Sequence, residues 1–469
     1  MSRYSPQRVR DPLHDLIEFQ PNVFEDAMWR VVQTRPFQRL RRVKQLAFSE
    51  LVYPGATHTR FSHSIGVFHT ARILMVNIEK QLGNEVIEHR AKVALAAALV
   101  HDVGHGPFSH SFETVGKRLD LPNLSHEAIS AKLIKDTEIA DCLALCDGGF
   151  GGFAAAVSNL IAAEEPTDIY SSVVSSQFDA DRLDYMRRDK LMTGTQHSEI
   201  DFTWLISNLQ IGTVSYGVDD VKLGEKDTLV LGSKAKYAAE AYVLGLFQLY
   251  PTVYFHKATR SAEKLFIELF VRVISLIRDS KLNCTGLSSS HPIAKFAKKP
   301  DSLDYFLNLD DTVIWGAIPC FCDAKDSVVS LLAKRLRDRK LLKSYDFRVR
   351  LKEKLPKLSP ESEDRIVSLA SAKAGEWSIA NSSDLPRLIM DEAKRSPYRR
   401  LGNESGPLGR MMIRNNGELV DLVEVSDVVK AAQVFKLNRV YFDGDDAESK
   451  KQIESALEAA IGEEKKNAA

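Results

Sequence analysis

The sequence predicts a mainly α fold: a helical core, a small β-hairpin and an α+β region towards the C-terminus. Apolar residues recur at helical spacing through most of the chain, whereas β-like runs are short. Glycine, proline and serine stand where the helical patterns stop. The 469 residues exceed one ordinary core. We therefore expect a core with an N-terminal arm over residues 1–280, and a helical and mixed region over 281–469 that serves assembly or regulation.

The first hundred residues justify the helical core element by element. Residues 1–20 read as an extended arm, and Pro36 divides residues 24–48 into two amphipathic helices. A third helix begins at about Arg60. The alanine-rich segment that ends at Val100 is apolar on nearly all sides, which predicts a central helix covered by its neighbours.

The remaining elements follow from the same kinds of signal. Ser125 can cap the helix that follows it, and a helical pattern stops near Gly194. Residues 208–233 contain two β-like runs and predict a hairpin. The other expected elements are a loop over 147–152, a helical stretch over 234–279 interrupted at Pro251, helices over 325–343 and 359–373, strands over 417–425 and 438–444, and a disordered tail over 463–469.

Composition narrows the class of protein. Lysine plus arginine equals aspartate plus glutamate at 63 each, so there is no global charge to attract nucleic acid. Five scattered cysteines without a CxxC pair favour a reducing compartment over a disulfide framework. No apolar run reaches membrane-spanning length, and the start of the chain has no apolar signal segment. We expect a cytoplasmic protein with no membrane partner.

Histidine and aspartate gather in the first part of the chain. Most of the twelve histidines fall between residues 58 and 126, and imidazole with carboxylate is a donor set for Mn, Fe, Co, Ni or Zn. His101 and Asp102 are adjacent at the end of the central helix, about 100° apart around its axis. Because one helix cannot close a coordination shell, ligands from other helices must converge. His63 and Asp181 are the candidates.

Structural interpretations of the same residues stay open at this point. A histidine on an apolar helix is more often a hydrogen-bonded core residue than a ligand. Asp181, Tyr185 and Asp189 share one helical face at spacing i, i+4, i+8, and this face could pair with the arginines of residues 35–42 in a structural network. The basic run 334–343 reads as a solvated helix face or a subunit contact.

Five sequence blocks resemble one family. In chain order they are DPLHDLIEF, RPFQRLRRVKQL, VYPGATHTRFSHSIGV, HDVGHGPFSH and DADRLDYMRRD, and they resemble the HD-domain deoxynucleoside triphosphate triphosphohydrolases (dNTPases). His63, His101, Asp102 and Asp181 reproduce the H…HD…D signature of the HD superfamily of metal-dependent phosphohydrolases. The resemblance implies an HD-domain helical core with one divalent transition metal per active site, held by these four side chains. It leaves open a Mg²⁺ ion that accompanies the nucleotide.

The resemblance also implies roles around that metal. His105 and His126 would line the phosphates, Glu113 would help to orient His110, and His110 would be the general acid near the α-phosphate. The implied substrate contacts are the phosphate oxygens for Arg60 and Arg182, the sugar 3′-hydroxyl for Gln45 and Asp189, the sugar ring for Leu46, Tyr185 and Tyr254, and the base for His256.

The implied reaction is hydrolysis of a deoxynucleoside triphosphate to deoxynucleoside and triphosphate by metal-activated water attack at the α-phosphate. Leu246 stands where the family has an arginine that contacts the triphosphate, which removes a cationic donor. The alternative is an HD phosphohydrolase or phosphodiesterase acting on another nucleotide or on single-stranded nucleic acid. A non-catalytic nucleic-acid-binding scaffold ranks last, because all four implied ligands are present. The resemblance also implies a homo-oligomer, and it leaves open a nucleotide activator.

Overall fold

The computed structural model of the protein describes residues 6–121, 124–147, 152–163, 166–197, 199–218, 221–396, 398, 410–432 and 434–467. The chain forms two compact units that alternate along the sequence. Residues 1–249, 299–315 and 397–433 form the first unit, and residues 250–298, 316–396 and 434–469 form the second. Helices predominate in both, so the mainly α prediction is confirmed. The functional division expected at residue 280 stays a prediction.

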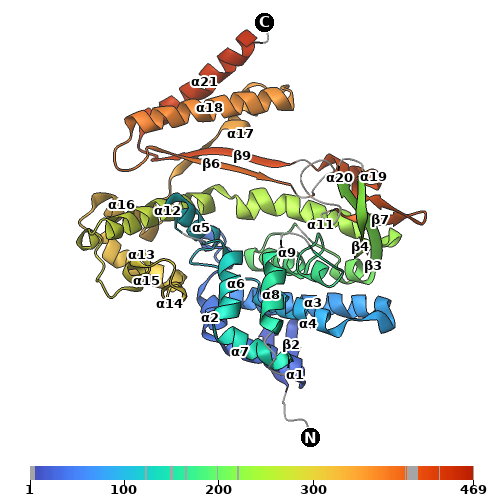
Figure 1. Cartoon of the computed structure of the whole chain (residues 1–469). Coiled ribbons are helices and arrows are strands. Elements are labelled where there is room, and N and C mark those ends of the chain that lie inside the picture. The colour runs from blue at the N-terminus through green and yellow to red at the C-terminus, as the bar shows by residue number, and fades with distance from the viewer. Residues whose placement is uncertain are drawn as a thin grey trace. The chain divides into compact units, whose positions relative to one another are not determined.

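The first unit contains the candidate site, and Figure 1 labels most of its elements. Its elements are β1 (Gln7–Asp11), β2 (Asp15–Phe19), α1 (Val23–Gln33), α2 (Arg35–Arg39), α3 (Arg60–Leu82), α4 (Glu88–Val100), α5 (His110–Arg118), α6 (His126–Asp136), α7 (Glu138–Ala144), α8 (Gly152–Ala162), α9 (Ala180–Thr193), α10 (Phe202–Ser207), β3 (Leu209–Val218), β4 (Val221–Leu231), α11 (Lys236–Leu249), α14 (Leu303–Leu307), β7 (Met412–Asn415), β8 (Glu418–Asp421), α19 (Leu422–Val425) and α20 (Asp427–Ala431). α15 (Asp311–Cys322) begins in this unit and continues into the second.

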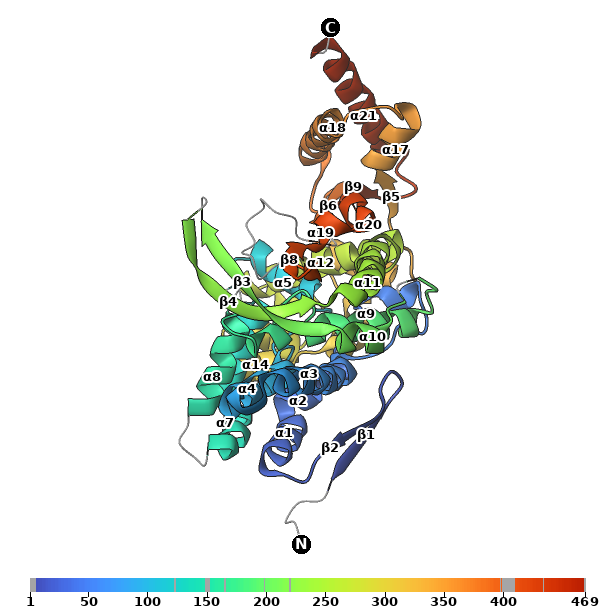
Figure 2. The ribbon, with the colours of Figure 1, turned by 90° about the vertical axis from the view of Figure 1, so that its right-hand side faces the viewer.

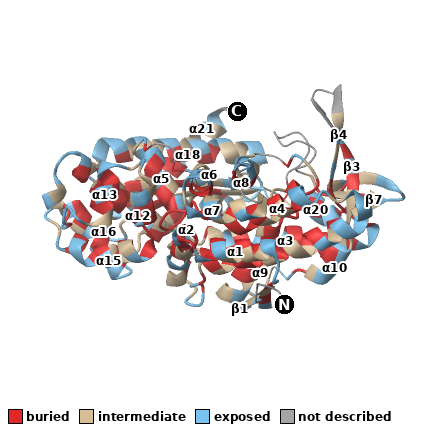
Figure 3. Cartoon of the chain, turned by 60° about the horizontal axis from the view of Figure 1, so that its bottom comes forward, coloured by how far each residue is buried: buried red, intermediate tan, exposed pale blue. Residues whose placement is uncertain are grey.

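Helices α3, α4 and α9 form the scaffold of the site. α4 is the predicted central helix, and its last eight residues except one are buried. α3 packs against both α4 and α9, and Figure 3 shows buried positions along it. Asp179 caps α9 by accepting a hydrogen bond from the backbone N–H of Arg182, and Gly194 ends it in the left-handed conformation with φ +72°. The predicted helix start at Arg60 and stop at Gly194 are confirmed.

The N-terminal arm is a β-hairpin rather than a single extended segment. β1 and β2 pair antiparallel from Gln7↔Phe19 to Asp11↔Asp15 (Figure 2). Alternation along β2 buries Ile17 and Phe19. The Phe19 ring stacks on that of Phe68 in α3, with centroids 5.3 Å apart. The arm is therefore fixed to the scaffold by an apolar contact as well as by strand pairing.

The predicted hairpin over residues 208–233 is confirmed, because β3 and β4 pair antiparallel from Leu209↔Leu231. These strands belong to a sheet of order β3-β4-β7-β8, in which β4 meets β7 in parallel at Leu231↔Ile413. The strand predicted over 417–425 is wrong in its second half. β8 ends at Asp421, whose carboxylate accepts from the N–H of Val423 and starts α19.

The second unit joins a small sheet to several helices. Its elements are α12 (Lys257–Arg278), α13 (Pro292–Lys298), α16 (Ser327–Arg337), β5 (Lys343–Asp346), α17 (Phe347–Lys354), α18 (Pro360–Asn381), β6 (Leu388–Arg395), β9 (Phe435–Phe442) and α21 (Ala447–Asn467). The sheet has the order β5-β9-β6 and is antiparallel throughout. α18 and α21 lie side by side (Figure 1), and both contribute to a buried apolar cluster with the sheet.

Some C-terminal predictions need correction. The tail expected to be disordered is helical as far as Asn467, because α21 is anchored by Leu457 and Ile461 in the buried cluster; residues 468 and 469 lie outside the described residues. The helix predicted over 325–343 is shorter, since α16 ends at Arg337. The helix predicted over 359–373 is longer, because α18 continues to Asn381.

The helical stretch predicted over 234–279 is interrupted at Pro251, as expected. α11 ends at Leu249, a π-helical turn covers Tyr250–Tyr254, and α12 begins at Lys257. Pro251 has no N–H to continue the helical ladder. The loop predicted over 147–152 falls mostly outside the described residues. Within the described ranges no single helix combines the length and apolar composition needed to cross a membrane; one bent pair, Glu138–Asp147 with Gly152–Ala162, does so by length and composition only.

Candidate active site

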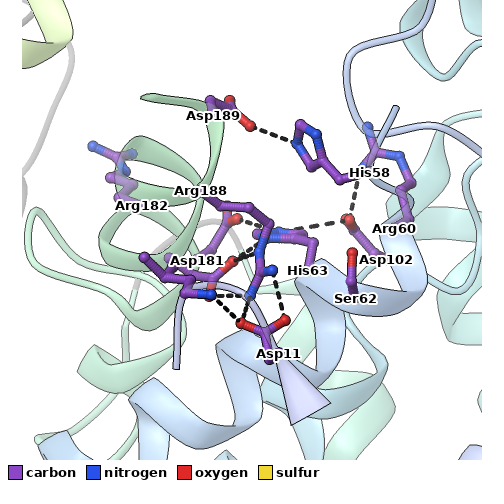
Figure 4. A network of polar contacts seen from close by, with 12 residues as sticks. Asp11, His58, Arg60, Ser62, His63, Asp102, Asp181, Arg182, Arg188 and Asp189 are labelled. Carbon is purple, nitrogen blue, oxygen red and sulfur yellow. Dashed lines mark hydrogen bonds and ion pairs between the residues drawn. The ribbon is translucent and has the colours of Figure 1, made fainter. Parts of the chain in front are cut away.

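Four side chains of the first unit converge on one point, with His63 on α3, His101 and Asp102 at the end of α4, and Asp181 on α9. His63 Nε2 lies 2.9 Å from Asp181 Oδ1 and 3.8 Å from Asp102 Oδ2. His101 Nε2 lies 3.3 Å from Asp102 Oδ1 and 3.8 Å from Asp181 Oδ1. Figure 4 shows three of them, His63, Asp102 and Asp181, turned towards one another. The structure thus brings the four predicted ligands together, and they are named the metal centre below.

The second ring nitrogens show which atoms a metal could use. His101 Nδ1 is 3.0 Å from the carbonyl oxygen of Ala98, an acceptor, so this nitrogen carries a proton. His63 Nδ1 is 2.9 Å from Asp184 Oδ2 and donates to it. The Nε2 atoms of both rings are buried, and neither forms a well-aligned hydrogen bond with any described residue despite the carboxylate oxygens nearby. Imidazole nitrogens and carboxylate oxygens that face a common point fit a divalent metal.

The charge of the metal centre also favours a cation. Burial alone would lower the pKa of His63, but the carboxylates of Asp181 and Asp184 raise this pKa to about 10. Burial would raise the pKa of Asp102, but Arg60 and His101 hold this pKa well below its usual value. Asp102 is therefore ionised, and the centre binds a proton tightly. A metal cation can replace that proton, because both are held by the same lone pairs and the same negative charge.

Close packing fixes the segment that follows α4. A Cβ atom on Gly104 would collide with the backbone of α6, so only glycine permits this approach. The Gly104 N–H donates to Ser130 Oγ at 2.9 Å, and Ser130 Oγ donates to the carbonyl oxygen of His101 at 2.9 Å. The loop that carries two of the four metal-centre residues is therefore tied directly to α6.

Arg39 also holds this loop. Its side chain is completely buried and donates to the carbonyl oxygens of Val103, His105 and Leu309. The structural alternative that pairs residues 35–42 with the acidic face of α9 is wrong for this arginine. Helical spacing alone does not predict this role, because it does not reveal a neighbouring loop with unpaired carbonyl groups.

A second group, named the imidazole cluster, consists of His105, His110 and His126 around Glu113. Glu113 Oε1 is 2.7 Å from His126 Nδ1, and Oε2 is 3.4 Å from His110 Nδ1. The His105 and His126 rings stack with centroids 3.9 Å apart. The His110 side chain is 74% exposed. His105 Nε2 lies 3.2 Å from Asp102 Oδ1, which joins this cluster to the metal centre.

Charge within the imidazole cluster is unevenly divided. Burial would raise the pKa of Glu113, but hydrogen bonds from His110 and His126 lower it overall. Burial, together with the Arg60 guanidinium, holds the pKa of His105 well below its usual value. His105 is therefore neutral, whereas Glu113 stays ionised and can stabilise a proton on either of its two imidazole partners.

A strained turn presents His110. Phe108 and Ser109, which precede α5, have φ values of +53° and +56°, a region that non-glycine residues rarely adopt. Ser109 Oγ accepts from Arg60 Nε at 2.9 Å. Asp311 accepts from the backbone N–H of Phe108 at 2.8 Å through Oδ1, and through Oδ2 from that of Lys44 at 2.9 Å. These bonds hold the turn in place.

Comparison with known proteins agrees with this arrangement. The sequence model of the family described as "HD domain" matches residues 60–186. The protein named YwfO from Bacillus subtilis is 30% identical over 436 residues, which cover 92% of this chain and 90% of that protein. The chain belongs to the HD-domain family.

Two other similarities bear on the class of enzyme. A crystal structure described as a phosphohydrolase from Bacteroides thetaiotaomicron superposes with a TM-score of 0.69 at 26% identity, covering 94% of this chain and all of that one. The SAMHD1 homolog of Dictyostelium discoideum, named a deoxynucleoside triphosphate triphosphohydrolase, is 29% identical over 290 residues, which cover 60% of this chain and 52% of that protein. The protein is an HD-domain phosphohydrolase with a candidate site for a divalent metal.

Four of the residues predicted to contact the sugar, Gln45, Leu46, Tyr185 and Asp189, lie in the first unit. Asp189 Oδ1 lies 2.9 Å from His58 Nε2, and both side chains are buried (Figure 4). The backbone N–H of Gln45 donates to the carbonyl oxygen of His58, and Gln45 Oε1 is buried without a hydrogen bond to any described residue. His58 therefore links two predicted sugar contacts. Leu46 and Tyr185 are half-buried in the same unit.

The other predicted substrate contacts either form ion pairs with residues of the first unit or belong to the second unit. Arg60 forms an ion pair with Asp102, and Arg182 Nε lies 3.3 Å from Asp179 Oδ2. The predicted contacts Tyr254 and His256 belong to the second unit, so their part in the site stays a prediction. Leu246 is buried in α11 and brings no charge to its position.

Sequence reasoning assigned no role to several residues that support the HD site. Asp184 lies on the same helix as Asp181, and its Oδ2 contacts His63. His58 precedes α3 and contacts Asp189. The block DPLHD contains two more supporting side chains, Asp11 and His14. The i, i+4 spacing of Asp184 and Arg188 could have predicted their ion pair, because charged side chains on a buried helical face require partners.

Proposed function

We propose that the protein hydrolyses deoxynucleoside triphosphates to deoxynucleoside and triphosphate. The observation that supports this most is the convergence of His63, His101, Asp102 and Asp181 next to three further imidazoles. The similarity to a relative named as a deoxynucleoside triphosphate triphosphohydrolase supports the substrate class. Bound at the metal centre, a divalent cation such as Mn²⁺ would activate water and neutralise phosphate charge.

The chain's own residues would carry the remaining steps. Arg60 and Arg182 would hold phosphate oxygens, and neutral His105 would donate a hydrogen bond to the same group. A water oxygen forms a bond to the α-phosphorus while the bond from phosphorus to the 5′-oxygen breaks. His110, held by Glu113, donates its proton to that leaving oxygen, which imidazole can do near neutral pH. His126 shares Glu113 with His110 and can help return the proton.

Binding would distinguish deoxyribose by close contact. Gln45 and Asp189 would form hydrogen bonds with the 3′-hydroxyl, the carboxylate of Asp189 as an acceptor, with His58 orienting Asp189. Leu46, Tyr185 and Tyr254 would pack on the sugar, and Tyr254 would leave no room for a 2′-hydroxyl. His256 would lie near the base. A buried amide oxygen such as that of Gln45 gains most from a substrate hydroxyl that it can pair with.

The products decide the test. Purified protein is incubated with Mn²⁺ and each deoxynucleoside triphosphate in turn, in buffer with and without Mg²⁺, and products are separated by ion-exchange chromatography. The proposal expects deoxynucleoside and intact triphosphate in equal amounts. Release of orthophosphate or pyrophosphate instead would contradict cleavage of the bond between the α-phosphorus and the 5′-oxygen.

Leu246 favours a second candidate function. Its apolar side chain stands where the resembled dNTPases have a phosphate-binding arginine, so the triphosphate loses a charge-assisted donor. The metal centre would then serve hydrolysis of another nucleotide or of single-stranded nucleic acid. A panel of ribonucleotides, monophosphates, cyclic dinucleotides and short DNA separates the two. Turnover of one of these at least tenfold faster than any deoxynucleoside triphosphate would favour the second candidate.

We also propose that the protein acts as a homo-oligomer, with residues 281–469 contributing to assembly or to regulation by a nucleotide activator. Light scattering coupled to size-exclusion chromatography, with and without added nucleotide, tests this part. A monomer under both conditions, with unchanged turnover, would contradict it.

A further inference from the structure

Two side chains of the N-terminal hairpin end in a buried polar group between α3 and α9. Asp11 Oδ2 accepts from Arg188 Nη1 at 2.7 Å, and Oδ1 accepts from Nη2 at 3.2 Å (Figure 4). His14 Nε2 lies 2.7 Å from Asp184 Oδ1. All four side chains are almost completely buried. A hairpin about 170 positions away in sequence thus reaches the ion pair on α9.

The same ion pair contacts a residue of the metal centre. Arg188 Nε donates to Asp184 Oδ2 at 2.7 Å, and Arg188 Nη2 donates to Asp184 Oδ1 at 3.0 Å. Asp184 Oδ2 also accepts from His63 Nδ1 at 2.9 Å. Asp184 therefore contacts the hairpin, Arg188 and His63 at the same time. Because its Oδ2 accepts from the His63 ring, the position of Asp184 fixes the direction of that ring.

Packing leaves this group little freedom. A Cβ atom on Gly66, one turn after His63 on α3, would collide with the Arg188 guanidinium and the Asp184 carboxylate. The glycine thus allows α3 to lie directly on the ion pair. On the other side, the Asp11 carboxylate is fixed by its own turn, because Oδ1 also accepts from the backbone N–H groups of Leu13 and His14, at 2.9 and 3.0 Å.

The charges of the group explain why it matters to a metal ligand. Among Asp11, Asp184 and Arg188, two carboxylates face one guanidinium, so negative charge exceeds positive charge beside the Nδ1–H of His63. Negative charge at this position makes the opposite nitrogen, Nε2, a stronger electron donor. Without Asp11, the guanidinium of Arg188 would have Asp184 alone as its carboxylate partner in this group and would draw that charge away from His63.

We propose that Asp11 and His14 are positioning residues for His63, and that the N-terminal hairpin is thereby part of the metal-binding apparatus. The proposal rests on the metal centre put forward above. Neither side chain touches the metal. Asp11 balances Arg188, His14 holds Asp184, and the resulting carboxylate position aims His63 Nε2 at the ion and strengthens its bond.

Metal affinity provides a readout that is independent of turnover. The full-length protein is stripped with a chelator and titrated with Mn²⁺, and free Mn²⁺ is followed by electron paramagnetic resonance. The variants are Asp11→Asn and His14→Phe. Arg10→Gln is the matched control, because Arg10 lies in the same hairpin, is mostly exposed and pairs with exposed Asp15. Circular dichroism and the thermal midpoint of each stripped protein report folding.

The proposal expects Mn²⁺ to bind about 10- to 100-fold more weakly to Asp11→Asn and His14→Phe, and with unchanged affinity to Arg10→Gln. Folded variants that bind Mn²⁺ as tightly as the wild type would overturn it, and so would an equal loss in the control. If Asp11→Asn does not fold, His14→Phe decides alone, since its ring keeps the volume of the imidazole and removes the hydrogen bond to Asp184. A wild-type protein that binds no Mn²⁺ would instead refute the metal centre itself.

Discussion

The metal centre and the imidazole cluster use the same residue types, but the protein holds them differently. In the metal centre, His63 and His101 donate through Nδ1 to protein acceptors and keep Nε2 for the shared point. In the imidazole cluster, His110 and His126 both direct Nδ1 at the carboxylate of Glu113. His63 is 1% exposed at its side chain, whereas His110 is 74% exposed.

This difference separates two kinds of chemistry. Rings that are buried and fixed by their second nitrogen suit a cation that has to stay bound. An exposed ring held by one carboxylate suits a proton that leaves and returns in every cycle. Because the contact between Asp102 and His105 joins the two regions, substitutions on either side of it should show whether metal binding and turnover are separable.

Removal of Asp181 should have the largest effect. The Asp181→Ala variant loses one of the two carboxylates of the metal centre, so we expect metal content near zero and turnover at background, with the fold retained. Elemental analysis and the product assay on one sample measure both. Glu199→Gln, an exposed carboxyl change beyond the end of α9, serves as the control. Wild-type metal content in Asp181→Ala would contradict the ligand assignment.

A change in the imidazole cluster should reduce turnover and leave metal binding intact. In Glu113→Gln the amide cannot stabilise a proton on His110 or His126, so we expect kcat to fall by about 10²-fold, a usual size for general acid–base catalysis. Metal content by elemental analysis should match the wild type. If both quantities fell together, the two regions would act as one site.

Asp311 holds the turn before His110, and its buried carboxyl should make protein stability depend on pH. Burial raises the pKa of this carboxyl to about 7, above its value in unfolded chains. Its contribution to stability is therefore complete below about pH 4 and is lost as pH rises through about 7. Between pH 5 and pH 8 the loss should be about 2 to 3 kcal/mol of unfolding free energy relative to Asp311→Asn.

Urea unfolding of the wild type and of Asp311→Asn at both pH values measures this loss, because other titrating groups cancel in the difference. A difference between the two proteins that is the same at pH 5 and pH 8 would show that Asp311 does not titrate in this range.

The smallest effect is expected on the sugar side. His58→Gln weakens the hydrogen bond to Asp189 and leaves the metal centre and the imidazole cluster unchanged. We therefore expect KM to rise about 3- to 10-fold, the effect of one ordinary hydrogen bond, with kcat unchanged. Steady-state kinetics with one deoxynucleoside triphosphate measures both constants. A fall in kcat with KM unchanged would place His58 in the chemistry instead.

The sequence was sufficient to predict the main helices and the proposed metal ligands, but not the residues that hold those ligands in place. Helical spacing and capping residues predicted α3, the central helix and the end of α9, because these signals are local. Asp184 was missed because a helical face gives a direction and not a distance. Asp11, His14 and Asp311 lie far along the chain from the residues they contact, and one sequence contains no record of such pairs. The tail beyond residue 463 was misjudged because its charged composition hides the buried face of α21.

Anomalous diffraction from crystals soaked in Mn²⁺ tests the central claim most directly. The account predicts one strong peak in each chain, within about 2.3 Å of His63 Nε2, His101 Nε2 and an oxygen of each of Asp102 and Asp181. A peak on Glu113 and the imidazole cluster instead, or no peak at the point where the four side chains converge, would contradict it.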